Sequence, residues 1–219
     1  ASCLVGSEMC IRDRYYTILH ILGIRIESGE KIIQTNIRLI KMNSDLKVLK
    51  KKVNMSKLRD WYEELEKSYS HLKWSAEDSN VDEGVGGHIL KGVYGWALQS
   101  NLEDLEKPCP PYNITKEEKH EYRDTAAMFG YINEIKEQFP YAHQFSIAVH
   151  PPGTQINLHS DSDDFYKIHV PIYSNNRSLF IFEPSREYIL PDEGKMYLVN
   201  TSVKPVSYTH LTLPTIYSV

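Results

Sequence analysis

The feature that most constrains the fold of this chain is a change of hydrophobic period at Pro140. After Pro140, apolar residues alternate with other residues in four short runs, at Phe145, Ile147 and Val149, at Ile168, Val170 and Ile172, at Leu179 and Ile181, and at Met196 and Leu198. Period-two alternation is typical of strands with one buried face. Turn residues separate the runs: Pro151-Pro-Gly153, Asn175-Asn176, Pro184 and Asp192-Glu-Gly194. Short strands with this spacing predict a sandwich or a jelly-roll barrel.

The chain before Pro140 follows a helical period instead. Ser56 can cap a helix whose apolar residues recur at three-and-four spacing: Leu58, Trp61, Tyr62, Leu65, Tyr69 and Leu72. The capping box Thr115–Glu118 predicts a second helix that continues to Phe139, through Tyr122, Ala126, Phe129, Ile132 and Ile135. Residues 89–98 predict a weaker strand, because Gly92 and Gly95 interrupt it. Two helices before an all-β half predict an α+β domain whose helices buttress one sheet.

Both ends of the chain are unlike the rest. Residues 1–14 and 205–219 resemble translated sequencing-adapter read-through, a contaminant of assembled environmental reads, although genuine irregular tails are the alternative. We expect a poorly defined N-terminal segment over residues 15–54, with Met42 and Met55 as possible starts, and one domain over residues 55–204.

Composition and charge narrow the class of partner. The net charge of −4 does not indicate nucleic-acid binding, and no apolar run reaches the ~18 residues of a membrane span, so we expect neither partner. With Cys3 and Cys10 in the suspect end, Cys109 alone predicts no disulfide framework and fits a cytoplasmic location. The basic run at Lys47 and Lys50–Lys52 is interpreted as a solvated face.

The run His159-Ser160-Asp161 carries the most chemistry. On an extended strand, residues two apart point to the same face, so an imidazole and a carboxylate would lie together. They are two of the three ligands of a 2-His-1-carboxylate iron site. The alternative is a solvated acidic loop, because Asp163 and Asp164 follow. His143 and His150 are interpreted as structural or exposed residues.

Lys167 and His169 form a second candidate pair. Alternation alone places Ile168 and its apolar partners toward the core, and Lys167 and His169 toward water. In a small barrel, however, the second strand face lines the interior. A buried Lys and His would then need a partner, which a carboxylate-bearing small molecule would supply.

Between about Tyr141 and Lys204, roughly a third of the chain, the sequence resembles a known enzyme family. The matching motifs are Pro152-Gly153, His159-Ser160-Asp161, Lys167-Ile-His169-Val-Pro-Ile172, Asn175 and Gly194-Lys-Met-Tyr-Leu-Val-Asn-Thr201. They resemble the aspartyl/asparaginyl β-hydroxylase-like branch of the Fe(II)/2-oxoglutarate-dependent oxygenases. The resemblance implies a double-stranded β-helix, a jelly-roll or cupin-like fold. It also implies a dioxygenase that uses Fe(II), 2-oxoglutarate and O2 to hydroxylate a peptide side chain or a small molecule.

The resemblance assigns roles to four residues. His159 and Asp161 would be the catalytic metal ligands, and His169 would contact the carboxylate of the cosubstrate or substrate. Lys167 stands where the family often has Arg, whose bidentate fork a lysine does not reproduce. The family's distal His would fall at about position 205 or 206, and an Arg that binds 2-oxoglutarate would follow about ten residues later. Neither is present, so we expect an inactive, C-terminally truncated fragment in which His210 would be an accidental ligand.

Two alternatives belong to other classes. A metal-free jelly-roll module with a binding or structural role predicts no affinity for Fe(II) or Mn(II) and no effect of Asp161→Ala. A cupin-type metalloprotein would need a closely spaced His-x-His, which the sequence lacks.

Overall fold

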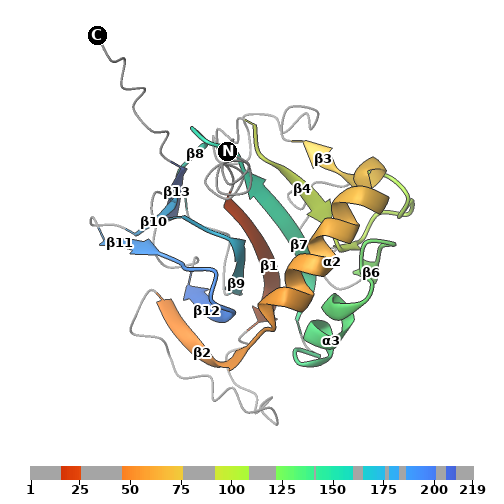
Figure 1. Cartoon of the computed structure of the whole chain (residues 1–219), viewed down its shortest axis with the longest axis horizontal. Coiled ribbons are helices and arrows are strands. Elements are labelled where there is room, and N and C mark those ends of the chain that lie inside the picture. The colour runs from red at the N-terminus through yellow and green to blue at the C-terminus, as the bar shows by residue number, and fades with distance from the viewer. Residues whose placement is uncertain are drawn as a thin grey trace, which may run out of the picture.

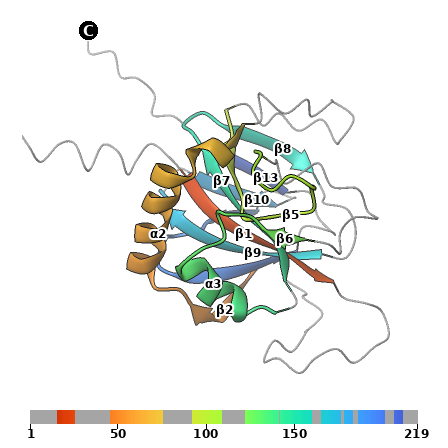
Figure 2. The same ribbon diagram turned by 90° about the vertical axis from the view of Figure 1, so that its right-hand side faces the viewer.

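The computed structural model describes residues 16–25, 46–75, 92–108, 122–140, 142–159, 165–175, 178–182, 186–200 and 206–210. Over these ranges the protein is α+β, with mostly antiparallel strands and two α-helices, as the sequence predicts. Figures 1 and 2 show both helices packed against one side of the larger sheet. The described strands form separate sheets and do not close into a barrel. No helix in these ranges is long and apolar enough to cross a membrane.

The larger sheet has seven strands in the order β2-β12-β9-β1-β7-β4-β3. Their bounds are Tyr16–Arg25 (β1), Leu46–Lys52 (β2), Trp74–Ser75 (β3), Tyr94–Ala97 (β4), His143–His150 (β7), Phe165–Tyr173 (β9) and Lys195–Asn200 (β12). The four-stranded sheet has the order β11-β10-β13-β8, from Gln155–His159 (β8), Ser178–Phe182 (β10), Arg186–Ile189 (β11) and Val206–His210 (β13). Gln99–Ser100 (β5) and Arg123–Asp124 (β6) form a two-stranded ladder.

Strand β1 occupies the centre of the larger sheet, although it comes first in the chain. It pairs antiparallel with β7 on one side and with β9 on the other. Its residues Leu19 and Ile21 are 0% and 1% exposed. The segment that we expected to be poorly defined therefore contains a central strand and, in β2, an edge strand of the same sheet.

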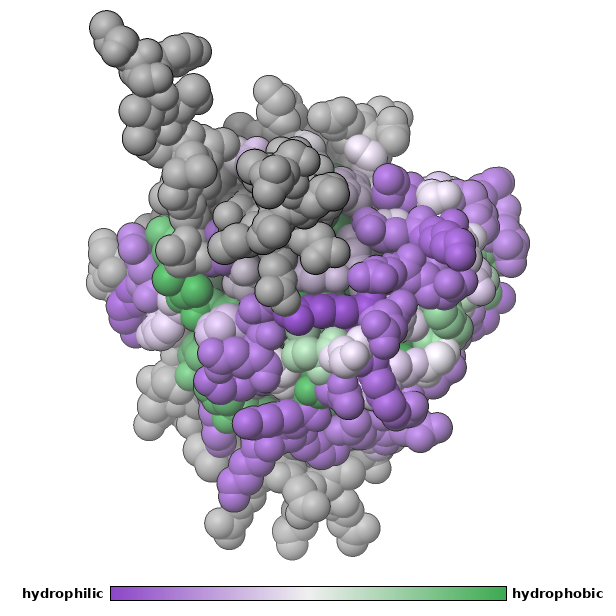
Figure 3. Space-filling view, viewed as in Figure 1, coloured by the Kyte–Doolittle hydropathy of each residue, from purple (hydrophilic) through white to green (hydrophobic). Residues whose placement is uncertain are grey.

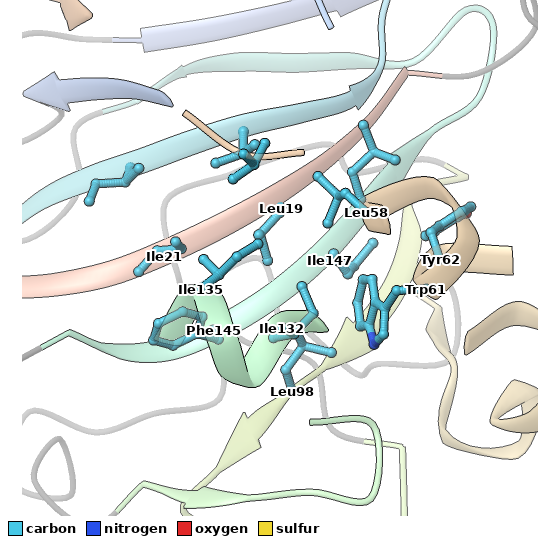
Figure 4. Packing of buried hydrophobic residues seen from close by; sticks show 14 of the residues in the cluster. Leu19, Ile21, Leu58, Trp61, Tyr62, Leu98, Ile132, Ile135, Phe145 and Ile147 are labelled. Carbon is cyan, nitrogen blue, oxygen red and sulfur yellow. The ribbon is translucent and has the colours of Figure 1, made fainter. Parts of the chain in front are cut away.

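Helix α2 (Met55–Ser68) covers the larger sheet with the apolar face that the sequence predicts. Its residues Leu58, Trp61, Tyr62 and Leu65 are buried. Figure 4 shows Leu58, Trp61 and Tyr62 beside side chains of α3 (Tyr131–Glu137) and facing those of β1 and β7, so residues from both halves of the chain share one core. The helix begins two residues earlier than expected: Asn54, not Ser56, is its N-cap, and its side chain accepts a hydrogen bond from the Lys57 amide.

The second predicted helix is much shorter than expected. Its capping box lies outside the described residues, and residues 122–130 are not helical. Arg123 and Asp124 instead pair with β5, and the Thr125 hydroxyl donates to the carbonyl of Ala97. These tertiary bonds hold residues 123–124 extended, and a turn follows in which the Met128 amide donates to the carbonyl of Thr125. Helix α3 begins after Gly130, whose φ of 54° suits glycine. Of the weaker strand predicted over residues 89–98, residues 89–91 lie outside the described residues, and Tyr94–Ala97 form β4.

A second core lies between the two sheets. It consists of buried Phe180, Phe182, Leu190, Tyr197 and Val199. The alternation of β10 is therefore opposite to our expectation, because Phe180 and Phe182 face inward while Leu179 and Ile181 are half-buried. The larger aromatic side chains fill the space between the sheets, which the period alone does not indicate.

The lysine run lies on the surface as predicted. Lys47, Lys50, Lys51 and Lys52 are exposed on β2, which is an edge strand. Figure 3 shows hydrophilic residues along β2 and over the outer side of α2. Lysines on an edge strand hinder pairing with another chain, so a structural role accounts for this run.

Candidate functional site

His169 lies at the centre of the candidate site, on the face of β9 that looks toward the smaller sheet. Its side chain is 0% exposed and its ring meets that of Phe180 edge-on, with centroids 5.4 Å apart. The expectation that His169 faces water is therefore wrong. The opposite face of β9 is also buried, as predicted, with Ile168 and Val170 in the core under the helices. The sequence predicted one apolar face, but not the second sheet that covers the other.

The surroundings of His169 disfavour positive charge. Burial lowers its pKa well below the usual 6.5, and the positive charges of Lys167 and His150 lower it further. His169 is therefore neutral at neutral pH, in a field to which Lys167 adds positive charge. Such a field favours an anion over a cation at this point.

Lys167 lies two residues before His169 on β9 and is half-buried. Its backbone pairs with Val199 of β12, while His169 pairs with Tyr197 of the same strand. Val199 and Tyr197 both contribute to the core between the sheets. Residues two apart on a strand share a face, so Lys167 and His169 belong to the same inter-sheet surface.

Position 159 ends β8 in the opposite sheet. Its backbone pairs with Val206 of β13, and Val206 pairs with Phe182 of β10. Phe182 is 0% exposed and faces the larger sheet. Because directly paired residues share a face, position 159 lies on the surface that looks toward β9. Asp161 lies outside the described residues. The structure therefore brings Lys167 and His169 together on β9, and places position 159 in the opposite sheet.

The described residues do not supply the third ligand that the candidate iron site needs. Val206, which has no donor atom in its side chain, pairs with His159 where the resemblance places the distal His. His210 pairs with Ser178, four residues further along β13 and about 13 Å from position 206, too far to replace it. Within the described residues, no group of three His, Cys, Asp or Glu side chains could hold a metal.

Three residues near the site have a role that the sequence did not indicate. His150, which we interpreted as structural or exposed, is 3% exposed and acts electrostatically on His169. Phe180 and Tyr197 were not singled out, because only the pairing of distant strands brings them to His169. His143, by contrast, stacks on Tyr122 at 5.5 Å between ring centroids, which fits its interpretation as structural.

Comparison with known proteins adds no family to this description. No family model matches the chain, and no curated protein matches it significantly. The geometry of the inter-sheet site and the motifs of the sequence therefore carry the functional argument.

Proposed function

We propose that this chain is part of an Fe(II)/2-oxoglutarate-dependent oxygenase of the aspartyl/asparaginyl β-hydroxylase-like branch, which hydroxylates a peptide side chain or a small molecule. The observation that carries the proposal is the buried His169. It lies beside Lys167 on one sheet, opposite the sheet that bears His159.

The path of the chain supports a double-stranded β-helix as the finer description of the fold. From β7 to β13 the chain alternates between the two sheets except at the β10–β11 hairpin: β7, β9 and β12 lie in the larger sheet, and β8, β10, β11 and β13 lie in the smaller one. Apart from this hairpin, strands that follow one another from β7 onward belong to different sheets. Two facing antiparallel sheets with such crossovers are typical of jelly rolls.

The chemistry of Lys167 and His169 fits a carboxylate ligand. A lysine ammonium has three donors, and an imidazole donates or accepts according to its protonation. Both side chains lie in a buried or half-buried surface, where a charge-assisted hydrogen bond to a carboxylate is stronger than in water. 2-Oxoglutarate, a small dicarboxylate, has the charge that complements these two side chains.

In this chain, the proposed metal site would lack its third protein ligand. His159 and Asp161 would supply two ligands from one strand segment, and Val206 supplies none. A site with two protein ligands binds iron weakly, so we expect the chain to show little or no turnover. No reaction step is assigned to iron in this chain.

A metal-free jelly-roll module with a binding or structural role is the second candidate function. The observation that favours it is Val206, an apolar residue opposite His159. This module would bind a carboxylate ligand at Lys167 and His169 without any contribution from His159 or Asp161. The effect of metal on ligand binding distinguishes the two candidates.

The test of the proposal is binding of 2-oxoglutarate to the full chain, measured by calorimetry. Lys167→Gln should weaken binding roughly 10- to 100-fold, because a lost hydrogen bond to a charged group costs about 1.5–3 kcal/mol. Lys50→Gln, on the exposed edge strand β2, is the matched control and should leave the affinity unchanged. Absence of binding, or equal weakening by both variants, would contradict the proposal.

A further inference from the structure

Four aromatic rings form a row where helix α2 packs against the larger sheet. The ring of Tyr94 on β4 meets that of Trp96 on the same strand, with centroids 6.2 Å apart. Trp96 meets Tyr62 of α2 at 6.1 Å, and Tyr62 meets Tyr173 of β9 at 5.9 Å, all edge-on. Tyr62 and Trp96 are buried, whereas Tyr94 and Tyr173 are half-buried. The row therefore has a buried centre and two ends nearer the solvent.

Tyr62, at the centre of the row, has a basic partner for its proton. Its hydroxyl donates a hydrogen bond of 2.8 Å to Oε1 of Glu66, one turn further along α2. Burial raises the pKa of Tyr62, and the negative charge of Glu66 raises it further, so the phenol keeps its proton at neutral pH. The Nε1–H of Trp96, by contrast, donates to the carbonyl of Tyr69, which is a much weaker base than a carboxylate.

Positive charges lie over the other three rings of the row. The Nζ of Lys73 is 4.8 Å from the ring centroid of Tyr94 and 6.0 Å from that of Trp96. The Arg59 guanidinium, whose charge is partly compensated by an ion pair, is 5.2 Å from the centroid of Tyr173. A cation is attracted to the electrons of the ring below it, so removal of an electron from these three rings is less favourable.

At Tyr62 the electrostatic effect has the opposite sign. The negative charge of Glu66 favours removal of an electron from the ring. A phenol that has lost an electron is a strong acid, and Glu66 lies within hydrogen-bond distance to accept its proton. Because the proton leaves with the electron, no net charge remains on the buried ring, and burial does not oppose the step. An electron missing anywhere in the row would therefore be supplied by Tyr62.

We propose that Tyr62 is a redox-active tyrosine that loses one electron to a radical-type one-electron oxidant and its phenolic proton to Glu66. The electron leaves through a half-buried ring at one end of the row, and the oxidant is reduced by one electron. Tyr62 becomes a neutral tyrosyl radical beside a protonated Glu66. One electron from a reductant such as ascorbate, with return of the proton, regenerates the pair. Radicals that meet the surface at Tyr94 or Tyr173 would thus be quenched at Tyr62.

This inference does not rest on the proposed function. The row lies in the core under the helices, on the opposite face of the larger sheet from Lys167 and His169. Edge-on contacts alone are typical of any aromatic core. The order of charges, with cations over the other rings and a carboxylate at the buried phenol of Tyr62, is the observation that points to electron transfer.

The experiment is one-electron oxidation of the metal-free full chain by photogenerated tris(bipyridine)ruthenium(III), followed by electron paramagnetic resonance of the frozen sample. We expect a neutral tyrosyl radical whose yield falls roughly tenfold or more in Tyr62→Phe and in Glu66→Gln. The first variant removes the phenol, and the second replaces its base by an amide. Glu66 is exposed, so Glu66→Gln tests the proposal even where Tyr62→Phe folds poorly.

Two variants are matched controls and should keep the full yield of radical. Tyr131→Phe removes a half-buried tyrosine whose hydroxyl accepts the amide of Asn54 and whose ring lies 5.3 Å from the Nζ of Lys57. Glu63→Gln removes an exposed carboxylate from the same helix as Glu66. The proposal is overturned if the unmodified chain gives no tyrosyl radical. It is also overturned if Glu66→Gln retains the full yield, or if the controls lose as much as the two test variants.

Discussion

At the scale of single residues, His169 shows how a fold sets the charge of a side chain. The larger sheet gives it two strand neighbours, the smaller sheet covers it with Phe180, and Lys167 and His150 add positive charge. Its pKa is lowered by burial first and by these charges second. A neutral imidazole at this point is the state from which a carboxylate ligand would be bound.

The lowered pKa of His169 predicts a loss of stability in acid. The unfolded chain has the usual pKa near 6.5, so between this value and the lower folded-state pKa the unfolded state binds more protons. The free energy of unfolding should therefore fall as the pH drops below about 6.5, by at most about 1.4 kcal/mol per pH unit from this group. Urea unfolding of the chain and of His169→Gln at several pH values measures it. Identical pH slopes for the two proteins would contradict this prediction.

In β9, the sequence predicted the environment of one strand face correctly and that of the other face wrongly. Alternation correctly placed Ile168, Val170 and Ile172 in a core, because that face is uniformly apolar. It placed His169 in water, because nothing in the local sequence reports that Phe180, from a strand in another sheet, covers the ring. His159 was proposed as a ligand from its spacing to Asp161, which lies outside the described residues, and stays a prediction.

At the scale of elements, helix α2 was the most predictable part and α3 the least. Leu58, Trp61 and Leu65 recur at helical spacing and form one apolar face, and this face is buried against the sheet. The local sequence was therefore enough to predict the helix. Residues 122–130 also follow a helical spacing in part, but bonds to distant residues override it. The carboxylate of Asp124 accepts hydrogen bonds from Gln99 and Lys136, and together with the β5 ladder these hold residues 123–124 extended.

The N-cap of α2 gives a prediction at the element scale. Asn54→Ala should lower the free energy of unfolding by about 1 kcal/mol, because the Lys57 amide loses its acceptor. Ser56→Ala, at the residue that the sequence favoured as the cap, is the matched control and should change stability by less than about 0.5 kcal/mol. Thermal unfolding of both variants provides the measurement. A larger loss in Ser56→Ala would overturn the assignment of the cap.

Strand β1 gives a second prediction at this scale. Leu19→Ala should destabilise the protein by about 2–5 kcal/mol, because it removes a fully buried side chain from the centre of the sheet. Val48→Ala, on the edge strand β2 with Val48 48% exposed, is the control and should have an effect of less than about 0.5 kcal/mol. Chemical denaturation measures both. Equal small effects would mean that residues 16–25 do not form part of the folded sheet.

At the scale of the whole molecule, the fold class was predictable and the strand order was not. Periods in the sequence indicated helices before strands, and the structure has this α+β arrangement. Pairing depends on contacts between strands more than 100 residues apart, such as those of β1 with β7 and β9, which no local period encodes. The proposed inter-sheet site depends on this strand order, because the positions assigned to it lie on strands of both sheets.

The central claim can be tested at Val206, because histidine at this position would restore the missing third metal ligand. If the inter-sheet site is that of an iron oxygenase, Val206→His should place an imidazole beside His159 and complete a 2-His-1-carboxylate set. Mn(II) binding, followed by electron paramagnetic resonance, is the direct measurement, with Val206→Ala as the matched control. We predict at least tenfold tighter binding for Val206→His, about 1.4 kcal/mol, and loss of that gain when His159→Ala is added. An affinity that does not increase, or a gain that persists without His159, would contradict the assignment.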